Sequence, residues 1–347
     1  MSKIRSLAVR VPKKNGEVLR RLLLDQNLLR TDLKIIQENE MLLFPVISKS
    51  SVLDGYKYVY EEFEVQNKDP ESYKDLLNIP NDLVDQLPTS FDCIGDIILI
   101  KISSELERYK EDIGVALLKA QKHAQTVIAI EPVSGELRVR SVEIIAGVNK
   151  TETVHTEYGL QMLLDVSDTY FSPRLASERK RIASLVKDDE VIVDLFTGVA
   201  PFPLMIATYA HPKKIIAIDK NPIAVEYAKK NIMRNDLLDI IDVFEADAED
   251  AELLLDTCGL KADRVIMNLP FDSFRFLPIA FSILSSFGMI HFYEIIKEAC
   301  IDERIGLIKK SALDHGYSII KVNVRKIKTY APHEFYIGID ITVKKNR

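Results

Sequence analysis

In the second half of the chain, short apolar runs alternate with longer segments of helical period. Polar residues close or follow these runs, which cover residues 191–194, 215–219, 240–244 and 264–267. Strands that alternate with helices are typical of an α/β fold with a doubly wound, mostly parallel sheet. Two later alternating segments, 319–324 and 336–343, predict an antiparallel strand pair that closes the sheet. We therefore expect a Rossmann-like domain over residues 166–347.

Two smaller α+β modules are predicted ahead of this domain, one over residues 1–65 and one over residues 76–165. A polar linker separates them at residues 66–75. In the first module, apolar alternation and a capping Asn15 predict a strand, a helix and a strand at residues 7–11, 15–28 and 41–46. In the second, the pattern predicts a helix at residues 105–123 and strands at 96–102, 126–130, 137–145 and 158–164.

A further helix is expected at the junction with the third domain. Ser172 is a good N-cap and Pro173 a good first helical residue, so the helix should run over residues 173–186. On this helix Arg174 and Glu178 lie one turn apart and face the same way. The helix therefore carries a cation and a carboxylate on one face.

The run that ends in Asp194 leads into a turn with Gly198, and the next run ends in Asp219. This pattern is typical of a βαβ nucleotide site, in which the second acid can accept two hydrogen bonds from a ribose diol. Nicotinamide and flavin enzymes share it. Here, however, Ala200 stands where a dinucleotide fingerprint has another glycine, whereas a pyrophosphate needs several bare amides. A cofactor without phosphate, S-adenosylmethionine, fits better, and Asp247 after the third run could bind its adenine amino group.

A loop after the fourth run has the sequence Asn268-Leu-Pro270-Phe271. With one change it matches the loop of base-modifying methyltransferases, where an amide and a backbone carbonyl hold a planar nitrogen and an aromatic ring stacks on the base. An amide cannot remove a ring proton such as that on guanine N1, so a carboxylate and a guanidinium are also needed. Glu178 and Arg138 have this chemistry, but sequence alone does not bring them to the loop.

The overall composition excludes several classes of protein. With 47% hydrophobic and 28% charged residues, it is that of an ordinary soluble chain. No apolar run is long enough to cross a membrane and the start lacks a signal peptide, so a cytoplasmic protein is expected. The cysteines lie far apart and the histidines show no ligand spacing, so neither disulfides nor a metal site is expected.

The charge is unevenly distributed. A net charge of −6 argues against indiscriminate nucleic-acid binding, but not against a local basic face. Such clusters are often only solvated surface, yet three that flank one cofactor crevice favour an RNA partner, because cations neutralise phosphates. The basic residues gather in three places: Lys3, Arg5, Arg10, Lys13, Lys14, Arg20, Arg21 and Arg30; Arg174, Arg179, Lys180, Arg181 and Lys187; and Lys321, Arg325, Lys326 and Lys328.

The order of these motifs resembles the archaeal and eukaryotic tRNA guanine-37 N1-methyltransferase family. The resemblance spans about residues 90–347 and, more loosely, the N-terminal module. Its motifs lie, in order, at residues 137–140, 170–179, 194–202, 217–222, 268–270 and 330–334. The Ser-Pro-Arg helix together with the Asn-Leu-Pro loop is specific, whereas the glycine turn alone is not. The resemblance implies a class I S-adenosylmethionine-dependent enzyme that methylates N1 of guanosine 37, beside the anticodon.

The resemblance also implies roles for individual residues. Glu178 would be the general base at N1, Arg138 would polarise O6, and Asn268 would contact both the base and the cofactor. The residues implied to bind the substrate are Tyr170, Arg174, Pro270 and Phe271, and those implied to contact the cofactor are Arg179, Phe196, Gly198, Asp219 and Asp247. The N-terminal module would dock on the tRNA body and the middle module would bind RNA, so a monomer would contact the anticodon stem-loop and the tRNA body.

Two residues depart from the family pattern. Ala200 replaces a usual glycine, and Phe271 stands where many relatives have lysine. Some archaeal members also methylate the tricyclic wyosine precursor, 4-demethylwyosine, at a carbon, so a bifunctional form stays open. An enzyme for an exocyclic amine, which would need Asn268 but not Glu178, is another alternative. A third is an RNA-binding protein with a vestigial cofactor fold, against which the intact cofactor residues argue.

Overall fold

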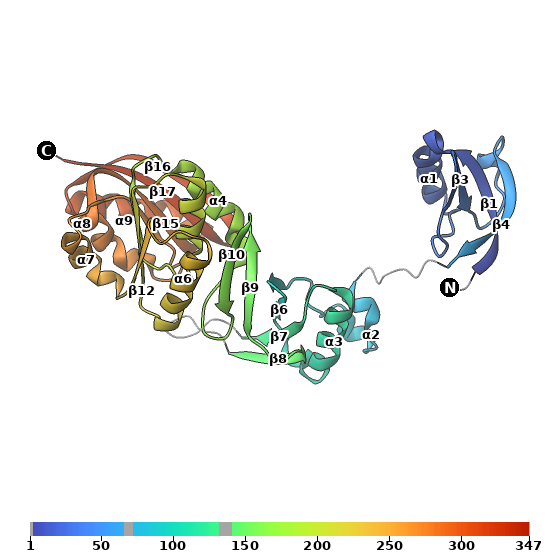
Figure 1. Cartoon of the computed structure of the whole chain (residues 1–347), viewed down its shortest axis with the longest axis horizontal. Helices are drawn as coiled ribbons and strands as arrows, with labels where there is room; N and C mark the ends of the chain where they lie inside the picture. Colours follow the sequence, from blue (N-terminus) through green and yellow to red (C-terminus); the bar gives the residue numbers. More distant parts are fainter. Residues whose placement is uncertain (1–2, 66–71, 132–140, 347) are drawn as a thin grey trace. The chain divides into compact units, whose positions relative to one another are not determined.

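The computed structural model describes residues 3–65, 72–131 and 141–346. It forms two compact units, Met1–Leu76 and Leu77–Arg347 (Figure 1). Arg138, together with the start of the strand predicted at 137–145, lies outside the described residues. Within the described ranges, no helix has both the length and the apolar character needed to span a membrane.

The first unit is an antiparallel sheet in the order β2-β3-β1-β4, with a helix packed on it. Its elements are β1 (Lys3–Pro12), α1 (Gly16–Asp25), β2 (Ile36–Glu38), β3 (Met41–Pro45) and β4 (Lys57–Glu64). Leu19 and Leu23, one turn apart on α1, pack with Val9 and Phe44 of the sheet. The helix ends before the predicted residue 28, because Asn27 has a φ of 52°, which a right-handed helix does not allow.

The second unit begins with a sheet in the order β5-β6-β7-β8. Its elements are α2 (Asn81–Val84), β5 (Asp92–Ile94), β6 (Ile97–Ile100), α3 (Lys110–Ala120), β7 (Thr126–Ile130) and β8 (Val142–Gly147). The helix predicted at 105–123 is divided, because Ser104–Tyr109 form a 3-10 turn ahead of α3. Gly114 lets α3 approach β8 closely, since a Cβ there would lie 2.8 Å from the Cβ of Ala146.

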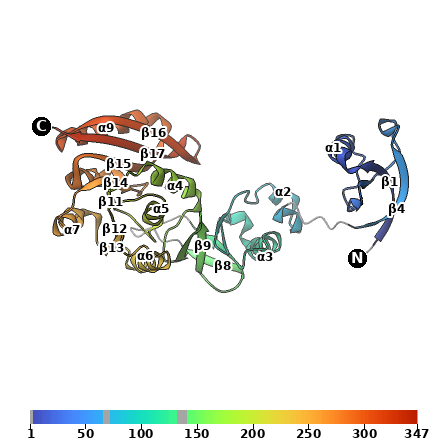
Figure 2. The same cartoon turned by 45° about the horizontal axis from the view of Figure 1, so that its top comes forward.

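The larger sheet of this unit has the order β13-β12-β11-β14-β15-β17-β16, as Figure 2 shows. Its strands are β11 (Val191–Asp194), β12 (Lys214–Asp219), β13 (Ile241–Glu245), β14 (Ala262–Met267), β15 (Leu284–Lys297), β16 (Tyr317–Ala331) and β17 (Glu334–Lys345). Neighbours from β13 to β15 are parallel, and β17 is antiparallel to both β15 and β16. The predicted doubly wound, mostly parallel sheet with a closing antiparallel pair is confirmed.

Helices cover both faces of this sheet. They are α4 (Ala176–Leu185), α5 (Pro201–Tyr209), α6 (Pro222–Arg234), α7 (Ala251–Thr257), α8 (Leu277–Ile283) and α9 (Ile301–Asp314). Successive residues of a strand point to opposite faces. Ile192 accordingly joins the core cluster that contains residues of α4, α5 and α6, whereas Val193 joins the cluster that contains residues of α7, α8 and α9. This double burial explains why the strands read as continuous apolar runs.

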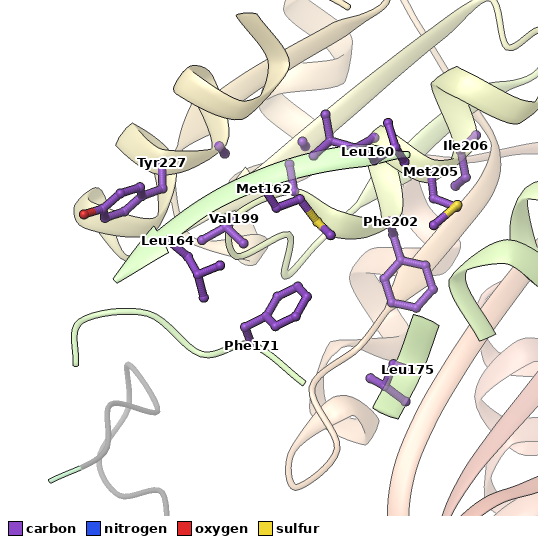
Figure 3. Packing of buried hydrophobic residues seen from close by; sticks show 14 of the residues in the cluster. Leu160, Met162, Leu164, Phe171, Leu175, Val199, Phe202, Met205, Ile206 and Tyr227 are labelled. Atoms are coloured by element: carbon purple, nitrogen blue, oxygen red, sulfur yellow. The ribbon is translucent and has the colours of Figure 1, made fainter. Parts of the chain in front are cut away.

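A hairpin of β9 (Glu152–Glu157) and β10 (Leu160–Asp165) lies between the two sheets in the sequence. Leu160, Met162 and Leu164 alternate along β10 and are buried in the same core cluster as Phe171 and Val199 (Figure 3). The sequence analysis assigned residues up to 165 to the middle module. In the structure, the apolar face of β10 packs into the core of the domain that follows.

Asn231 on α6 anchors this hairpin to the glycine turn. Its side chain is fully buried; the carboxamide oxygen accepts the backbone N–H of Leu163 at 2.6 Å, and its nitrogen donates to the carbonyls of Leu163 at 2.9 Å and Val199 at 3.1 Å. One amide thus satisfies the backbone of β10 as a neighbouring strand would. Buried backbone groups need such partners.

We expect Asn231→Ala to lower the free energy of unfolding by about 2 kcal/mol, because it leaves one buried and two partly buried backbone groups without their partner. Asn235→Ala is the matched control. Asn235 makes the same pair of bonds to the backbone of Gln161 at an exposed position, where water can replace them. Urea denaturation followed by circular dichroism measures both variants. Equal losses of stability in the two would contradict this account.

Candidate active site

A cavity of about 310 Å³ opens where strands β11, β12 and β14 end. This size is typical of a small-molecule site, and the position is where open α/β sheets bind ligands. The predicted site residues found in its lining are Tyr170, Arg179, Phe196, Gly198, Asp219, Asp247, Asn268 and Phe271. Arg174, Glu178 and Pro270 lie outside this lining, and Arg138 lies outside the described residues.

The glycine turn is held by the acid at the end of β12. The N–H of Gly198 donates to Oδ2 of Asp219 at 2.7 Å, and the N–H of Asn221 donates to Oδ1 at 2.9 Å. Gly198 has a φ of 56°, which glycine adopts without strain. Ala200 also has a positive φ, 66°, and so takes a left-handed conformation. Glycine adopts this conformation more easily than alanine, in line with the glycine that the family pattern has here.

The N-terminus of α5, which follows this turn, is poorly suited to a phosphate. Helix N-termini bind phosphates through their free backbone N–H groups. In α5 the first and third residues are Pro201 and Pro203, and proline has no N–H. Two donors that a pyrophosphate would use are therefore missing, which supports the prediction of a cofactor without phosphate.

The remaining lining offers what an adenosyl group needs. Asp219 ends β12, and Asp247, just after β13, keeps one carboxylate oxygen on the N–H of Glu249 at 3.0 Å. These carboxylates can accept hydrogen bonds from a ribose diol and an exocyclic amine. Phe196 and Phe276 meet edge to face at 4.9 Å beside them and provide an apolar surface for a planar base.

Asp194 lies directly behind this crevice and is fully buried. Its Oδ1 accepts the N–H of Phe196 at 3.4 Å, while its Oδ2 has no hydrogen-bond partner among the described groups. Burial raises the pKa of Asp194 to about 7, and the charge of Asp219 adds to the rise. The carboxyl group therefore ionises at a much higher pH than an exposed aspartate does.

The Asn268 loop closes the other end of the cavity and is firmly anchored. The Tyr336 hydroxyl donates to the carboxamide oxygen of Asn268, so the NH₂ group is the part of this side chain that can donate to a substrate. The hydroxyl of Ser273 bonds to the backbone of Leu269, and the N–H of Ile295 donates to the carbonyl of Pro270 at 2.8 Å. The loop is thus preorganised.

Glu178 lies in a buried cluster of polar groups. Arg181 donates to both of its oxygens at 3.0 and 2.8 Å, and Arg325 and the Tyr293 hydroxyl each donate to Oε1 at 2.8 Å. Burial opposes the charge, but these three partners offset that effect and lower the pKa of Glu178. The carboxylate is therefore ionised, although its hydrogen-bonding capacity is largely used.

A chain of charges continues from Arg181 across the sheet. Arg181 donates to Asp340 at 2.9 Å, Asp340 contacts Nδ1 of His291 at 2.6 Å, and Nε2 of His291 contacts Arg264 at 2.6 Å. Burial and the nearby guanidinium of Arg264 lower the pKa of His291, so the ring is neutral. Because Arg264 can only donate, Nε2 must be the acceptor, and the ring proton is on Nδ1.

The two remaining predicted cations have local partners. Arg179 is buried in an ion pair with Glu157 and also donates to the carbonyl of Ser172 at 3.1 Å. Its predicted contact with a cofactor therefore has to be made while it holds this pair. Arg174 pairs with Asp92 of the middle module at 2.6 Å, so it does not share a contact with Glu178, one turn further along the helix.

Several lining residues were missed by the sequence analysis. Lys220 and Asn221 follow Asp219 directly, so their position after the strand could have indicated them. Phe171, Asp272, Arg275 and Phe276 also line the cavity, but they lie on loops and on the 3-10 turn Ser273–Phe276, whose path the sequence pattern does not predict.

The fold and this cavity define a Rossmann-like methyltransferase. The family models identify it further: residues 153–320 match the TRM5/TYW2 methyltransferase domain, residues 73–151 the TYW2 N-terminal domain, and residues 8–54 the tRNA methyltransferase 5 N-terminal domain. The chain belongs to this TRM5/TYW2 methyltransferase family, so the resemblance found in the sequence is confirmed.

Individual relatives match over nearly the whole chain. It is 37% identical to tRNA (guanine(37)-N(1))-methyltransferase Trm5b of Pyrococcus abyssi, covering 97% of this chain and 99% of that protein. The crystal structure of wild-type Trm5b from Pyrococcus abyssi matches with a TM-score of 0.81 over 98% and 99% of the chains. A complex of aTrm5 and tRNALeu is 34% identical, with a TM-score of 0.75 over 98% and 100%.

A solved relative also contains a cofactor. The structure of TYW2 from M. jannaschii in complex with AdoMet is 32% identical to this chain, with a TM-score of 0.57. It covers 74% of this chain and 100% of its own.

We expect Asp194→Asn to stabilise the protein relative to the wild type as the pH rises from 4 to 8. The raised pKa means that the folded state binds a proton more tightly than the unfolded state, so wild-type stability falls as the pH rises toward 7. Asparagine cannot ionise and escapes this fall. Melting temperatures at several pH values measure the difference. Asp188→Asn, at an exposed carboxylate, is the control, and a constant offset for Asp194→Asn would overturn the assignment.

Proposed function

We propose that this chain transfers a methyl group from S-adenosylmethionine to N1 of guanosine 37 in tRNA. The observation that carries the proposal is the shared cavity, which brings the carboxylates of Asp219 and Asp247 and the amide of Asn268 together. One end suits an adenosyl group and the other a planar base. The names of the relatives, which include a tRNA (guanine(37)-N(1))-methyltransferase, support this substrate.

The cofactor end is proposed to hold S-adenosylmethionine through Asp219, Asp247, Gly198, Phe196 and Arg179. When bound there, S-adenosylmethionine supplies an electrophilic methyl group on sulfur. Asp219 would accept hydrogen bonds from the ribose, and Asp247 one from the adenine amino group. The crevice is lined by acids, and the helix start beside it lacks two N–H groups that a phosphate would need. Both features support this cofactor over a dinucleotide.

Asn268 is proposed to orient the target base. Its NH₂ group would donate to O6 of guanine, because the Tyr336 hydroxyl uses the carboxamide oxygen. Tyr170 and Phe271 line the same end and would flank the base, next to Pro270. Arg174 and Arg138 are further proposed substrate contacts, with Arg138 stabilising negative charge on O6 during deprotonation.

Glu178 is proposed as the general base that takes the proton from N1. Leu175 and Arg179, which are close to Glu178 in the sequence, line the cavity. The Tyr293 hydroxyl bonds to Glu178, the Tyr293 ring lies 6.0 Å from the Tyr336 ring, and the Tyr336 hydroxyl bonds to Asn268. To act, the carboxylate must exchange one of its partners for the substrate. Arg325 is the most exposed partner, with 32% of its side chain accessible against 25% for Arg181, so its bond is proposed to open.

The N-terminal and middle modules are proposed to bind the tRNA body and the anticodon stem-loop. The basic residues of the N-terminal module and the match to a tRNA methyltransferase 5 N-terminal domain support this role. A monomer suffices for this function, because one chain supplies the cavity. A cytoplasmic location stays a prediction.

The decisive experiment incubates the protein with labelled S-adenosylmethionine and unmodified tRNA transcripts that carry G37 or A37. Mass spectrometry of the nucleosides should find N1-methylguanosine in the G37 transcript alone. A transcript carrying 4-demethylwyosine tests the bifunctional alternative in the same assay. Cofactor binding without methylation of either G37 or A37 would refute the proposed substrate.

We expect Glu178→Gln to lower kcat for G37 methylation by roughly 100-fold or more, since it removes the general base. Calorimetric affinity for S-adenosylmethionine should be retained, because Glu178 lies outside the lining of the cavity. Glu226→Gln, an exposed glutamate on α6, is the matched control and should keep full activity. Full activity of Glu178→Gln would rule out its assignment as the base.

A second variant tests how the base is controlled. Arg325→Gln removes a cation that lowers the pKa of Glu178, so this pKa should rise. The acid side of the pH profile of kcat/KM should therefore shift to higher pH. An unchanged profile would mean that Glu178 does not titrate in the reaction.

A further inference from the structure

Two exposed aromatic rings meet at the mouth of the cavity. Phe271 of the Asn268 loop is 58% exposed and lines the cavity, and Tyr330 at the end of β16 is 54% exposed. Their ring centroids lie 5.9 Å apart at an interplanar angle of 75°. Large apolar side chains this accessible, next to a substrate site, are candidates for ligand contact.

The two rings are carried by separate segments, each held in place. Behind Phe271, the carbonyl of Pro270 accepts the N–H of Ile295 from β15. Behind Tyr330, the turn between β16 and β17 is fixed by Ala331 pairing with Glu334, and the carbonyl of His333 accepts the N–H of Glu298 at 3.0 Å. This turn belongs to the family motif at residues 330–334, and it brings an aromatic ring against Phe271 at the cavity.

The surroundings of the rings suit an RNA strand. Lys326, whose ammonium pairs with Glu298, and Lys328 lie on β16 within four residues of Tyr330, and the ammonium of Lys328 is 5.2 Å from the Tyr336 ring centre. Exposed aromatic rings flanked by cations are what single-stranded nucleic acids bind, through base stacking and phosphate neutralisation. An apolar peptide would gain nothing from these cations.

We infer that Tyr330 forms a second base subsite, which stacks on an unpaired nucleobase adjacent to the methylated guanine. This inference rests on the proposed function. Two nearly perpendicular rings cannot both lie flat against one planar base, so each ring stacks on a different base. Phe271, which lines the cavity, serves the target guanine, and Tyr330, outside it, serves a neighbouring base of the loop. Holding the neighbour keeps the target base out of the stack of the loop.

The test combines variants at Tyr330 with removal of a single base from the RNA. Full-length G37 tRNA is prepared intact and with an abasic nucleotide on either side of guanosine 37. On intact tRNA, Tyr330→Ala should raise KM about tenfold with kcat unchanged, and Tyr330→Phe should behave as the wild type. On one of the abasic tRNAs the wild type should show the same loss, and Tyr330→Ala should add nothing to it, because the two partners of one contact are coupled.

Phe287→Ala is the matched control. Phe287 is a similarly exposed phenylalanine, 54% accessible, near the start of β15, whereas Ile295, which bonds to the Asn268 loop, is near its end. Loss of the Phe287 ring should leave KM unchanged. The inference is overturned if Tyr330→Ala has no effect, or if its effect is equal on intact tRNA and on both abasic tRNAs. If the wild type does not methylate intact G37 tRNA, the proposed function fails instead, whatever the variants do.

Discussion

The ionised carboxylate of Glu178 is buried between Arg181 and Arg325, and its need for partners holds α4 against the antiparallel strands of the sheet. A charge in the interior is stable only with well-placed partners, and Arg181 is in turn held by Asp340, which contacts His291. This chain of polar groups joins α4 to β15 and β17. The antiparallel end of the sheet therefore supports the residue proposed as the base, although its strands follow the cofactor strands in the sequence. Its strands fix the partners of the proposed base.

Much of the candidate cofactor cavity could be predicted from the sequence, because its residues lie close together along the chain. Apolar runs that end in Asp194 and Asp219, with a turn between them, place these residues at one sheet edge without further information. The prolines at the start of α5 strengthen the case against a phosphate, and they too are visible in the sequence. Family resemblance supplied the specific substrate, which local patterns cannot.

Other parts depend on contacts between distant segments and were not predictable. Strand β15 was missed because its buried stretch contains His291 and Glu294, which break the apolar signal and pair with Asp340 and Arg304 on other elements. The cluster around Glu178 unites residues up to 147 positions apart. In the hairpin, β10 was predicted at residues 158–164, whereas β9 was missed, because its buried residues Thr153 and Glu157 are polar and find their partners, Asp96 and Arg179, on other segments.

The packing of β10 has a practical consequence for dissecting the protein. Leu160, Met162 and Leu164 belong to the core of the methyltransferase domain, although they precede its first helix. A chain shortened to begin at residue 166 would leave the opposing apolar surface open to water and would tend to aggregate. A shortened chain that begins at Leu77 keeps the whole second unit, so isolated catalytic fragments should start there, at the boundary between the two compact units.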